Sequence, residues 1–293
     1  HKVVSTIFCE CRREYRKEGP EELKPVGETD FMNALAERSA AECSGGARVA
    51  HGIIGYADFR LGARVEATLQ AHLESSPKHF RGIRHMTRWH EAAQEMDIPP
   101  RSPRNLMADA TWREGFAQLA RHGLPFDAWF VFTQYDELVD LARAFPEQTI
   151  VINHIGGVSG TGPYLGRKDE VMQAWRRGVE QAAACPNVFM KLGGLGQPRV
   201  GFGWELRERP PGSEELAAAY APYYLFCIEK FGPQRCLFES NFPVERASCS
   251  YAVLWNAYKR IASGCTPAEK ALLFHDNAAR VYRLDPVHAP LAS

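Results

Sequence analysis

Strand-like and helix-like stretches alternate along the whole chain, and this alternation constrains the fold more than any other feature. Runs rich in β-branched and aromatic residues occupy residues 3–11, 48–59, 80–86, 126–133, 149–155, 187–192 and 235–242. Longer stretches with apolar residues at helical spacing separate them, for example Val65, Leu69 and Leu73. Such strict alternation favours a parallel sheet covered by helices. No shift in composition divides the chain, so we predict a single domain over residues 1–293.

Two architectures satisfy this pattern, an open doubly wound sheet and a (β/α)8 barrel. The open sheet normally carries a glycine fingerprint after its first strand, and none follows residues 3–11. The later stretch 194–199 begins Gly-Leu-Gly but ends in Arg199, where that fingerprint requires glycine. We therefore predict an α/β fold of the (β/α)8 TIM-barrel type. Since only seven runs are present, we expect the first strand to be absent from this chain and to precede His1.

Charge and composition narrow the class of protein. The 35 Lys and Arg residues balance 35 Asp and Glu residues, which argues against nucleic acid or an anionic membrane surface as a partner. No apolar run approaches the ~20 residues that a membrane-spanning helix needs. The eight scattered cysteines are expected to be reduced, mostly buried thiols of a cytoplasmic protein. A small molecule is the expected partner, and formation of a homo-oligomer is left open.

Polar residues stand at the ends of most of the predicted strands, where barrel enzymes place their chemistry. A polar residue at one strand end also has a simpler interpretation, a hydrogen bond to a loop. Polar ends on several strands are harder to explain in that way, because they would converge on one mouth of a closed sheet. The residues are Glu10, Arg12, Tyr15, Arg84, His85, His154, Lys191, Glu239 and Asn241.

Five segments carry a resemblance to a known family. They are RGIRH at 81–85, VINHIGG at 151–157, NVFMKLG at 187–193, RCLFESNFPV at 235–244 and FHDNAARVYRL at 274–284. In this order they resemble the amidohydrolase-related TIM-barrel proteins, especially the branch with 2-pyrone-4,6-dicarboxylate lactonase and sugar lactonases. The resemblance covers essentially the whole chain. It implies a His-x-His pair on the absent first strand, a histidine on strand six, which His154 matches, and an aspartate ending strand eight.

The chain departs from that pattern at the last of these positions, where Asn241 replaces the aspartate. An aspartate there can bind a divalent metal and accept a proton from the attacking water. Asn241 cannot act as a general base, and an amide is a poor zinc ligand. Glu239 could supply the lost carboxylate, or it could form a buried ion pair with Lys191. We therefore expect no catalytic metal and no other cofactor, with a divalent metal such as zinc as the disfavoured alternative.

The remaining polar residues have candidate binding roles. His154 could polarise a carbonyl group or act as an acid or base near neutral pH. Arg84, with His85 beside it, suits bidentate capture of a substrate carboxylate, although a structural salt bridge is the alternative. The other candidates for pocket walls are Arg12, Tyr15, Trp89 and Trp204, with Lys191 as a further substrate-binding candidate.

These observations predict a hydrolase that opens a lactone or related ester of a small carboxylated molecule, with His154, Glu239 and Asn241 as its catalytic residues. A non-oxidative decarboxylase or hydratase is the enzymatic alternative, since the same superfamily contains both. A non-catalytic ligand-binding barrel is the second alternative, because Asn241 removes the expected base. The loops at 87–105 and 194–212 carry no motif that names the substrate.

Overall fold

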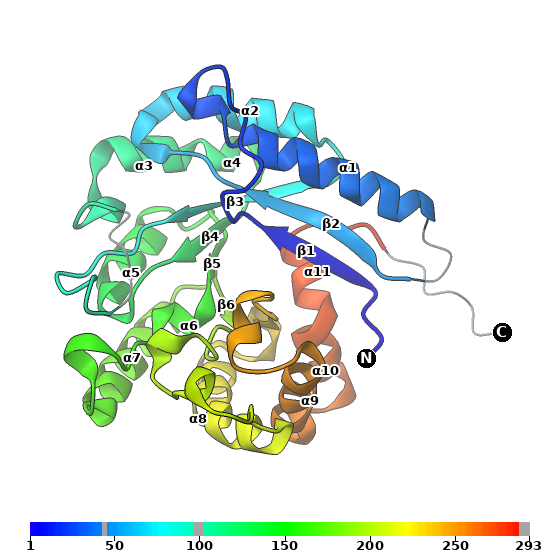
Figure 1. Ribbon diagram of the computed structural model, residues 1–293. Helices are drawn as coiled ribbons and strands as arrows, with labels where there is room; N and C mark the ends of the chain where they lie inside the picture. The colour runs from blue at the N-terminus through cyan, green and yellow to red at the C-terminus, as the bar shows by residue number, and fades with distance from the viewer. Residues whose placement is uncertain (43–45, 97–101, 287–293) are drawn as a thin grey trace. The chain divides into compact units, whose positions relative to one another are not determined.

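The computed structural model describes residues 1–42, 46–96 and 102–286. Within these ranges seven strands form one sheet whose order follows the chain from β1 to β7 (Figure 1). The strands are β1 (Ser5–Cys9), β2 (Arg48–Gly55), β3 (Phe80–Met86), β4 (Phe126–Trp129), β5 (Ile150–Ile152), β6 (Val188–Leu192) and β7 (Cys236–Phe238). The pairs β1–β2, β2–β3, β5–β6 and β6–β7 are parallel. This sequential order is that of a (β/α) barrel, whereas a doubly wound sheet reverses its order at a switch point.

Helices separate the strands, as the alternation predicts. They are α1 (Val26–Glu42), α2 (Glu66–Ser75), α3 (Ala110–Ala117), α4 (Leu119–His122), α5 (Tyr135–Ala144), α6 (His154–Gly157), α7 (Lys168–Ala183), α8 (Ser213–Phe231), α9 (Tyr251–Ile261), α10 (Pro267–Ala271) and α11 (Asn277–Val281). Side-chain caps mark several of their starts: Asp109 accepts the N–H of Trp112 at 2.8 Å, and Thr266 forms a capping box with Glu269. Gly123, with φ of 58°, ends α4 in the left-handed conformation that favours glycine.

Several strands are shorter than the sequence predicts. The runs 48–59, 126–133 and 235–242 predict strands that extend to the last residue of each run, but β2, β4 and β7 end four residues earlier. After β2 and β4 the apolar composition continues, because most of residues 56–59 and 130–133 are buried or half-buried, whereas residues 239–242 after β7 are mostly polar and half-buried. After β2 and β4, apolar character therefore marks burial and does not distinguish the last strand residues from the first loop residues.

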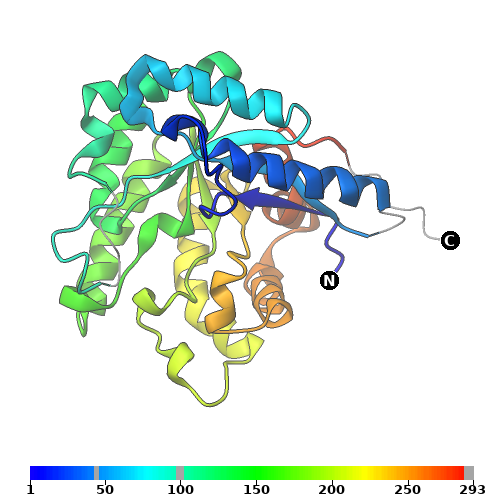
Figure 2. The ribbon, with the colours of Figure 1, turned by 45° about the horizontal axis from the view of Figure 1, so that its top comes forward.

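The chain forms two compact units. The first comprises His1–His85, Asp109–Asp127 and Ala279–Ser293, and the second comprises Met86–Ala108 and Ala128–Ala278. In the first unit, α1 packs against β2, as Figures 1 and 2 both show. Its core contains a cluster of aromatic rings from Phe59, Trp112, Phe116 and Phe126. The single domain over residues 1–293 stays a prediction.

The second unit is built on β5, β6 and β7, with α8 packed against β6 and β7. The aromatic residues Tyr220, Tyr223, Tyr224 and Phe231 of α8 are buried. The ring of Tyr224 contacts those of Phe238 and Tyr258 from β7 and α9. This stripe of aromatic residues joins a helix to the sheet, and it supplies apolar core to the unit that carries His154 and Glu239.

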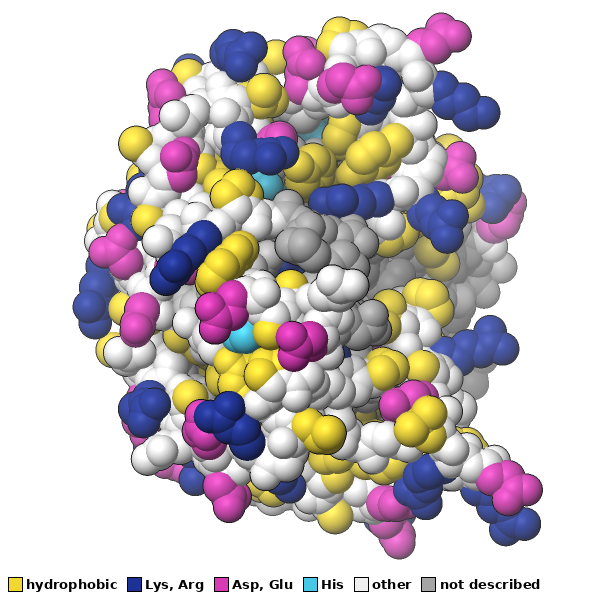
Figure 3. All heavy atoms as spheres, turned by 60° about the vertical axis from the view of Figure 1, so that its left-hand side comes forward, with side chains coloured by type: hydrophobic (Ala, Val, Ile, Leu, Met, Phe, Trp, Pro, Cys, Tyr) yellow, Lys and Arg dark blue, Asp and Glu magenta, His cyan; other side chains and the backbone are white. Residues whose placement is uncertain are grey.

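Other sequence expectations can be compared with the described residues. None of their helices is long and apolar enough to cross a lipid bilayer. The seven described cysteines form no disulfide; Cys185, Cys227, Cys236 and Cys249 are buried, whereas Cys11 is exposed. Cys43 lies outside the described residues. On the face drawn in Figure 3, basic and acidic side chains are interspersed, in keeping with the zero net charge.

Candidate active site

His154 stands on a short left-handed turn that directly follows β5. His154 and Ile155 have φ of 53° and 48°, and Gly156 and Gly157 continue the turn at 78° and 67°. For residues with a side chain this conformation costs roughly 1–2 kcal/mol each. Two buried donors hold the turn, because the Ile155 carbonyl accepts the Tyr135 hydroxyl at 3.1 Å and the Trp175 indole at 2.7 Å. Such stored strain is typical of a residue whose direction matters.

Glu239 holds the side chain and the main chain of His154 at once. Its Oε1 lies 2.6 Å from Nδ1 of His154 and 3.0 Å from the backbone nitrogen of the same residue. Burial disfavours the Glu239 charge, but the nearby His154 and Lys191 outweigh it and lower the pKa of Glu239 to about 2. An ionised carboxylate can only accept, so Nδ1 of His154 carries the proton and Nε2 carries the lone pair. This is the histidine tautomer that a general base requires.

Lys191 from β6 approaches the other oxygen of the same carboxylate. Its Nζ lies 3.8 Å from Oε2 of Glu239, and both side chains are largely buried. The ion pair between Lys191 and Glu239, which the sequence left as an alternative to a catalytic role, is therefore present. It does not exclude that role, because Glu239 contacts His154 through its second oxygen.

The loop after β6 packs three glycines against three ionisable residues. A Cβ atom at Gly193 would lie 2.3 Å from Cγ of Glu239, and one at Gly194 would lie 2.5 Å from Cβ of His154. A Cβ atom at Gly196 would lie 2.1 Å from Oε2 of Glu245. Real Cβ contacts are never this short, so only glycine allows the loop to lie this close. The stretch 194–199, which does not match the dinucleotide-binding fingerprint, therefore begins with glycines that pack directly against His154 and Glu245.

Asn241 lies beyond the end of β7 with φ of 49°, so the chain has already left the extended strand. Its Nδ2 donates to Oε1 of Glu245 at 2.9 Å. Glu245 also accepts the backbone N–H of Gly196 at 2.7 Å, through Oε2. Both oxygens of one buried carboxylate are therefore occupied by donors from two different segments.

Glu245 is a buried carboxylate that the sequence interpretation missed. It is fully buried, and burial raises its pKa to about 7, helped by the nearby charge of Glu239 and opposed by its two hydrogen bonds and by Arg199. Buried carboxylates with a strongly shifted pKa are frequent at functional sites. A weak signal was present, since Glu245 follows Asn241 by four residues, a spacing that brings side chains together in a helical turn.

Two further residues extend the cluster around His154. The edge of the Trp129 ring faces the His154 ring, with centroids 5.4 Å apart. The Arg88 guanidinium lies over the same indole, 4.4 Å from its centroid. The structure thus brings together His154, Lys191, Glu239 and Asn241 in the second unit, and adds Arg88, Trp129 and Glu245 to them.

Trp89 and Trp204, the two tryptophans that the sequence suggests as pocket walls, contact residues other than those around His154. The backbone N–H of Trp89 donates to Gln134 at 2.8 Å, and the Arg104 guanidinium lies 5.1 Å from the Trp89 ring. Trp204 stacks on Phe202 at 4.4 Å and is nearly buried. Neither tryptophan has a described contact with His154.

Five of the sequence-predicted residues belong to the first unit, where Arg84 pairs with Glu10. Nε of Arg84 lies 3.1 Å from Oε1 of Glu10, and the guanidinium also donates to the Glu10 carbonyl. Burial works against the charge of Arg84, but Glu10 outweighs it and raises the pKa of Arg84. The structural salt bridge that the sequence left as an alternative is therefore present.

His85 lies among aromatic rings, with Tyr56 and Phe59 centroids at 5.3 and 5.5 Å. Burial lowers the pKa of His85 to about 4, so the ring is neutral near pH 7. Its Nδ1 accepts the backbone N–H of Phe59 at 3.4 Å. These contacts give His85 a packing role, and none of them points to a ligand.

Arg12 and Tyr15 lie in the loop between β1 and α1. The Arg12 guanidinium is 5.6 Å from the Tyr56 ring. The buried Tyr15 hydroxyl has no hydrogen-bond partner among the described residues, and burial together with Glu10 and Glu28 raises its pKa. Glu28, at the start of α1, accepts the backbone N–H groups of Cys11 and Arg13 at 3.1 and 2.8 Å. This second carboxylate was also missed from the sequence.

The described residues of the second unit offer few groups to a divalent metal. Glu239 engages Nδ1 of His154 and Glu245 engages the amide nitrogen of Asn241, so each of these two residues can offer at most one atom, Nε2 or Oδ1, to an ion. Across the described ranges, no group of three or more His, Cys, Asp or Glu side chains is arranged to hold a metal ion. We therefore derive no step through a metal.

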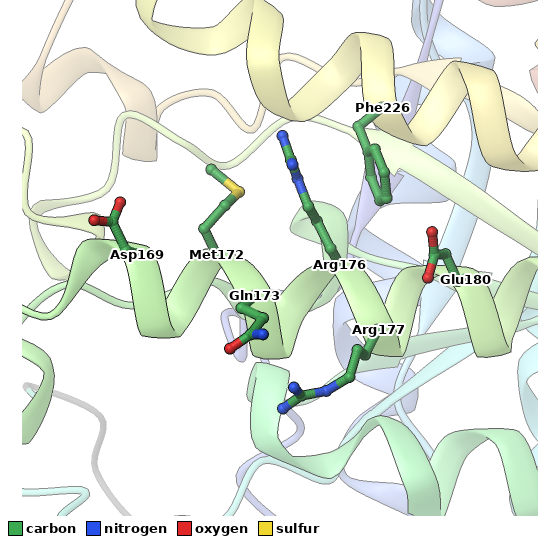
Figure 4. A pocket seen from close by; sticks show the side chains of 7 residues that line it. All are labelled: Asp169, Met172, Gln173, Arg176, Arg177, Glu180 and Phe226. Carbon is green, nitrogen blue, oxygen red and sulfur yellow. The ribbon is translucent and has the colours of Figure 1, made fainter.

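A shallow hollow on the surface of the second unit lies apart from this chemistry. It is lined along α7 by Met172, Gln173, Arg176 and their neighbours, with Phe226 of α8 opposite (Figure 4). The Arg176 guanidinium lies 5.0 Å from the Phe226 ring. None of the sequence-predicted site residues lines this hollow.

Most of the chain is similar in sequence to known proteins. A family model described as amidohydrolase matches residues 16–284. The uncharacterized protein y4mH of Sinorhizobium fredii is 35% identical over 91% of this chain and 78% of its own length. An L-fucono-1,5-lactonase of Burkholderia multivorans is 26% identical over 84% of this chain and 75% of its own length.

Solved structures agree with the fold. A crystal structure of an amidohydrolase from Burkholderia multivorans with bound zinc aligns with a TM-score of 0.68 at 22% identity. The alignment covers 97% of this chain and 99% of that one. At this identity the likeness concerns the fold, and it confirms the α/β barrel class predicted from the alternation of strands and helices.

Proposed function

The chain belongs to the amidohydrolase family, and from that premise we propose that this hydrolase opens a lactone with His154 as general base and Glu239 as the residue that orients it. The observation that carries the proposal is the short contact between Nδ1 of His154 and Oε1 of Glu239. This contact fixes the tautomer of His154 that carries the lone pair on Nε2. His154 also follows the end of β5, and barrel enzymes place their catalytic residues at such strand ends.

The pair can carry out both proton transfers of lactone hydrolysis. Nε2 of His154 removes a proton from water as the water oxygen attacks the carbonyl carbon. The tetrahedral intermediate then collapses with cleavage of the ring C–O bond, and the imidazolium returns the proton to the departing ring oxygen. The product is a hydroxy acid. The negative charge of Glu239 stabilises the imidazolium that exists between the two steps.

The proposal of a lactone as substrate is supported by the L-fucono-1,5-lactonases among the relatives, at 26% and 27% identity. Capture of a substrate carboxylate by Arg84 gains less support, because Arg84 already has a carboxylate partner in Glu10. We therefore place sugar-acid lactones first and carboxylated lactones second.

We further propose that catalysis does not depend on a metal. The support is the chemistry of Asn241, which presents an amide where the resemblance implies an aspartate, and whose nitrogen is turned toward Glu245. The pair of His154 and Glu239 supplies a general base that does not require a metal.

The test is a substrate panel with the full-length protein. L-Fucono-1,5-lactone, other sugar-acid 1,5-lactones and 2-pyrone-4,6-dicarboxylate are assayed for proton release, with the spontaneous rate subtracted, and the products are identified by NMR. We expect stoichiometric acid and a ring-opened product without carbon dioxide. Release of carbon dioxide from a carboxylated substrate would favour the decarboxylase alternative. Binding of these compounds with no turnover would favour the non-catalytic barrel.

A further inference from the structure

Asn241 and Glu245 form a pair in which the orientation of one side chain depends on the other. An amide group has nearly the same shape in its two flipped orientations, so its hydrogen-bond partners decide which end points where. Nδ2 of Asn241 donates to Oε1 of Glu245 at 2.9 Å. Oδ1 therefore points away from Glu245, and within the described part of the chain it has no hydrogen-bond partner.

The carboxylate of Glu245 is itself held by a fixed donor. The backbone N–H of Gly196 donates to Oε2 at 2.7 Å, and a Cβ at Gly196 would lie 2.1 Å from that oxygen. Ser248 fixes the same loop through a hydrogen bond to the Gly196 carbonyl. Since one oxygen is occupied by the main chain, the other is left to face Asn241 as an acceptor.

The Asn241 amide is linked to the residues around His154 through Glu245 and the loop after β6. It lies two residues after Glu239, and the loop that holds Glu245 through Gly196 also packs Gly194 against His154. The orientation of the amide therefore decides whether a hydrogen-bond acceptor or a donor is added to this cluster.

We propose that Glu245 is a positioning residue, which turns the Asn241 amide so that Oδ1 is offered as the acceptor for the attacking water. This inference rests on the proposed function. The Asn241 carbonyl oxygen keeps the hydrogen-bond-accepting part of an aspartate's role, while the proton itself goes to His154. Glu245 contacts neither the water nor the substrate, and it acts only through the orientation of Asn241.

The first test is Glu245→Gln, which preserves shape and hydrogen-bonding capacity. The N–H of Gly196 still requires an acceptor, so the oxygen of the introduced glutamine faces Gly196 and its NH2 group faces Asn241. Asn241 must then flip, and its own NH2 group replaces Oδ1 in the cluster. At pH 8 we expect kcat to fall about 10- to 100-fold, the typical effect of losing a hydrogen bond to a reacting group, with KM little changed and a melting temperature no lower than that of the wild type.

The second test restores the acceptor. In the double variant Asn241→Asp/Glu245→Gln, one oxygen of the introduced aspartate accepts from the NH2 group of the introduced glutamine, and the other again faces the cluster. We expect kcat to return to within about fivefold of the wild type, because the lost acceptor is restored. Asn241→Asp alone sets two carboxylates against each other, so we expect it to be less stable than the double variant.

The outcomes separate positioning from a structural role. Wild-type kcat in folded Glu245→Gln, or equal losses in the folded single and double variants, would overturn the proposal. If Glu245→Gln does not fold, Asn241→Leu removes Oδ1 directly and must lower kcat to a similar extent with KM little changed; wild-type kcat in folded Asn241→Leu would overturn the proposal.

A separate measurement tests the orientation of the Asn241 amide even if the proposed lactonase activity is not found. If the wild type hydrolyses no lactone, the Asn241 side-chain NH2 signals are followed by 15N NMR. Loss of their carboxylate-bonded shift in Glu245→Gln supports the orientation step, and unchanged signals contradict it.

Discussion

Oε1 of Glu239 accepts two hydrogen bonds from His154, one from Nδ1 at 2.6 Å and one from the backbone nitrogen at 3.0 Å. A single carboxylate oxygen therefore fixes the direction of the imidazole and also the strained main chain that carries it. The two residues are 85 positions apart in the sequence, and their pair joins the segment after β5 to the segment after β7.

Glu239→Gln should reduce kcat about 100-fold or more, because the imidazolium loses its counter-charge and the tautomer is no longer fixed by an obligate acceptor. The measurement is steady-state hydrolysis of whichever lactone the wild type turns over. Glu170→Gln is the control and should leave kcat unchanged, because Glu170 of α7 forms only an exposed ion pair with Arg167, the residue before the helix. A Glu239→Gln variant with wild-type kcat would contradict the role of the pair.

Gly194→Ala should disturb His154 directly. The new Cβ would meet Cβ of His154 at 2.5 Å, which cannot be relieved by a flexible chain end. Overpacking of this kind costs about 1–3 kcal/mol, and the positive φ of 78° adds about 1 kcal/mol. We expect both the free energy of unfolding and kcat to fall.

Gly166→Ala is the matched control for that variant. Gly166 has φ of 75°, yet no atom lies within 4 Å of the position of its added Cβ. It should lose about 1 kcal/mol of stability through backbone strain alone and keep its kcat. Equal behaviour of the two variants in urea unfolding and in turnover would show that the contact with His154 is unimportant.

The stability of the protein should depend on pH through Glu245. Its pKa is raised from 4.5 to about 7 in the folded state, so protonation favours folding. The contribution is complete below pH 4.5 and is lost as pH rises through about 7. It amounts to on the order of 3 kcal/mol, since each pKa unit corresponds to about 1.4 kcal/mol.

The measurement compares urea unfolding of the wild type and Glu245→Gln between about pH 4.5 and 8.5, a range that spans both pKa values. The glutamine variant cannot ionise, so the wild type should lose stability relative to it over this range. A constant difference between the two proteins would show that Glu245 ionises as easily in the folded protein as in the unfolded chain.

Chelation should leave activity intact if hydrolysis depends on the His154–Glu239 pair alone. We expect untagged, full-length protein to contain far less than one equivalent of zinc or manganese by elemental analysis, and to keep its rate after dialysis against EDTA. Asn241 is the reason, because an amide is a poor replacement for a carboxylate ligand. Near-stoichiometric metal whose removal abolishes turnover would overturn this expectation.

The sequence determined the features that depend on local periodicity. Alternating runs predicted the seven strands and their parallel, sequential order, because side-chain patterning sets which face of each element is buried. Strand ends directed attention to His154, Lys191 and Glu239, because parallel strands present their carboxyl ends at one edge. The substitution at Asn241 was visible from the segment 235–244 alone.

Only the tertiary structure decided which groups these residues meet. The contact of Gly196 with Glu245 joins positions 49 residues apart, and no periodicity in the chain specifies such a pair. The same applies to Arg84 and Glu10, whose separation is 74 residues. Burial then sets the chemistry, because it raises the pKa of Glu245 to about 7 while the neighbouring Glu239, paired with His154, stays ionised. Residue identity is local information, whereas protonation and hydrogen-bond direction depend on neighbours that folding supplies.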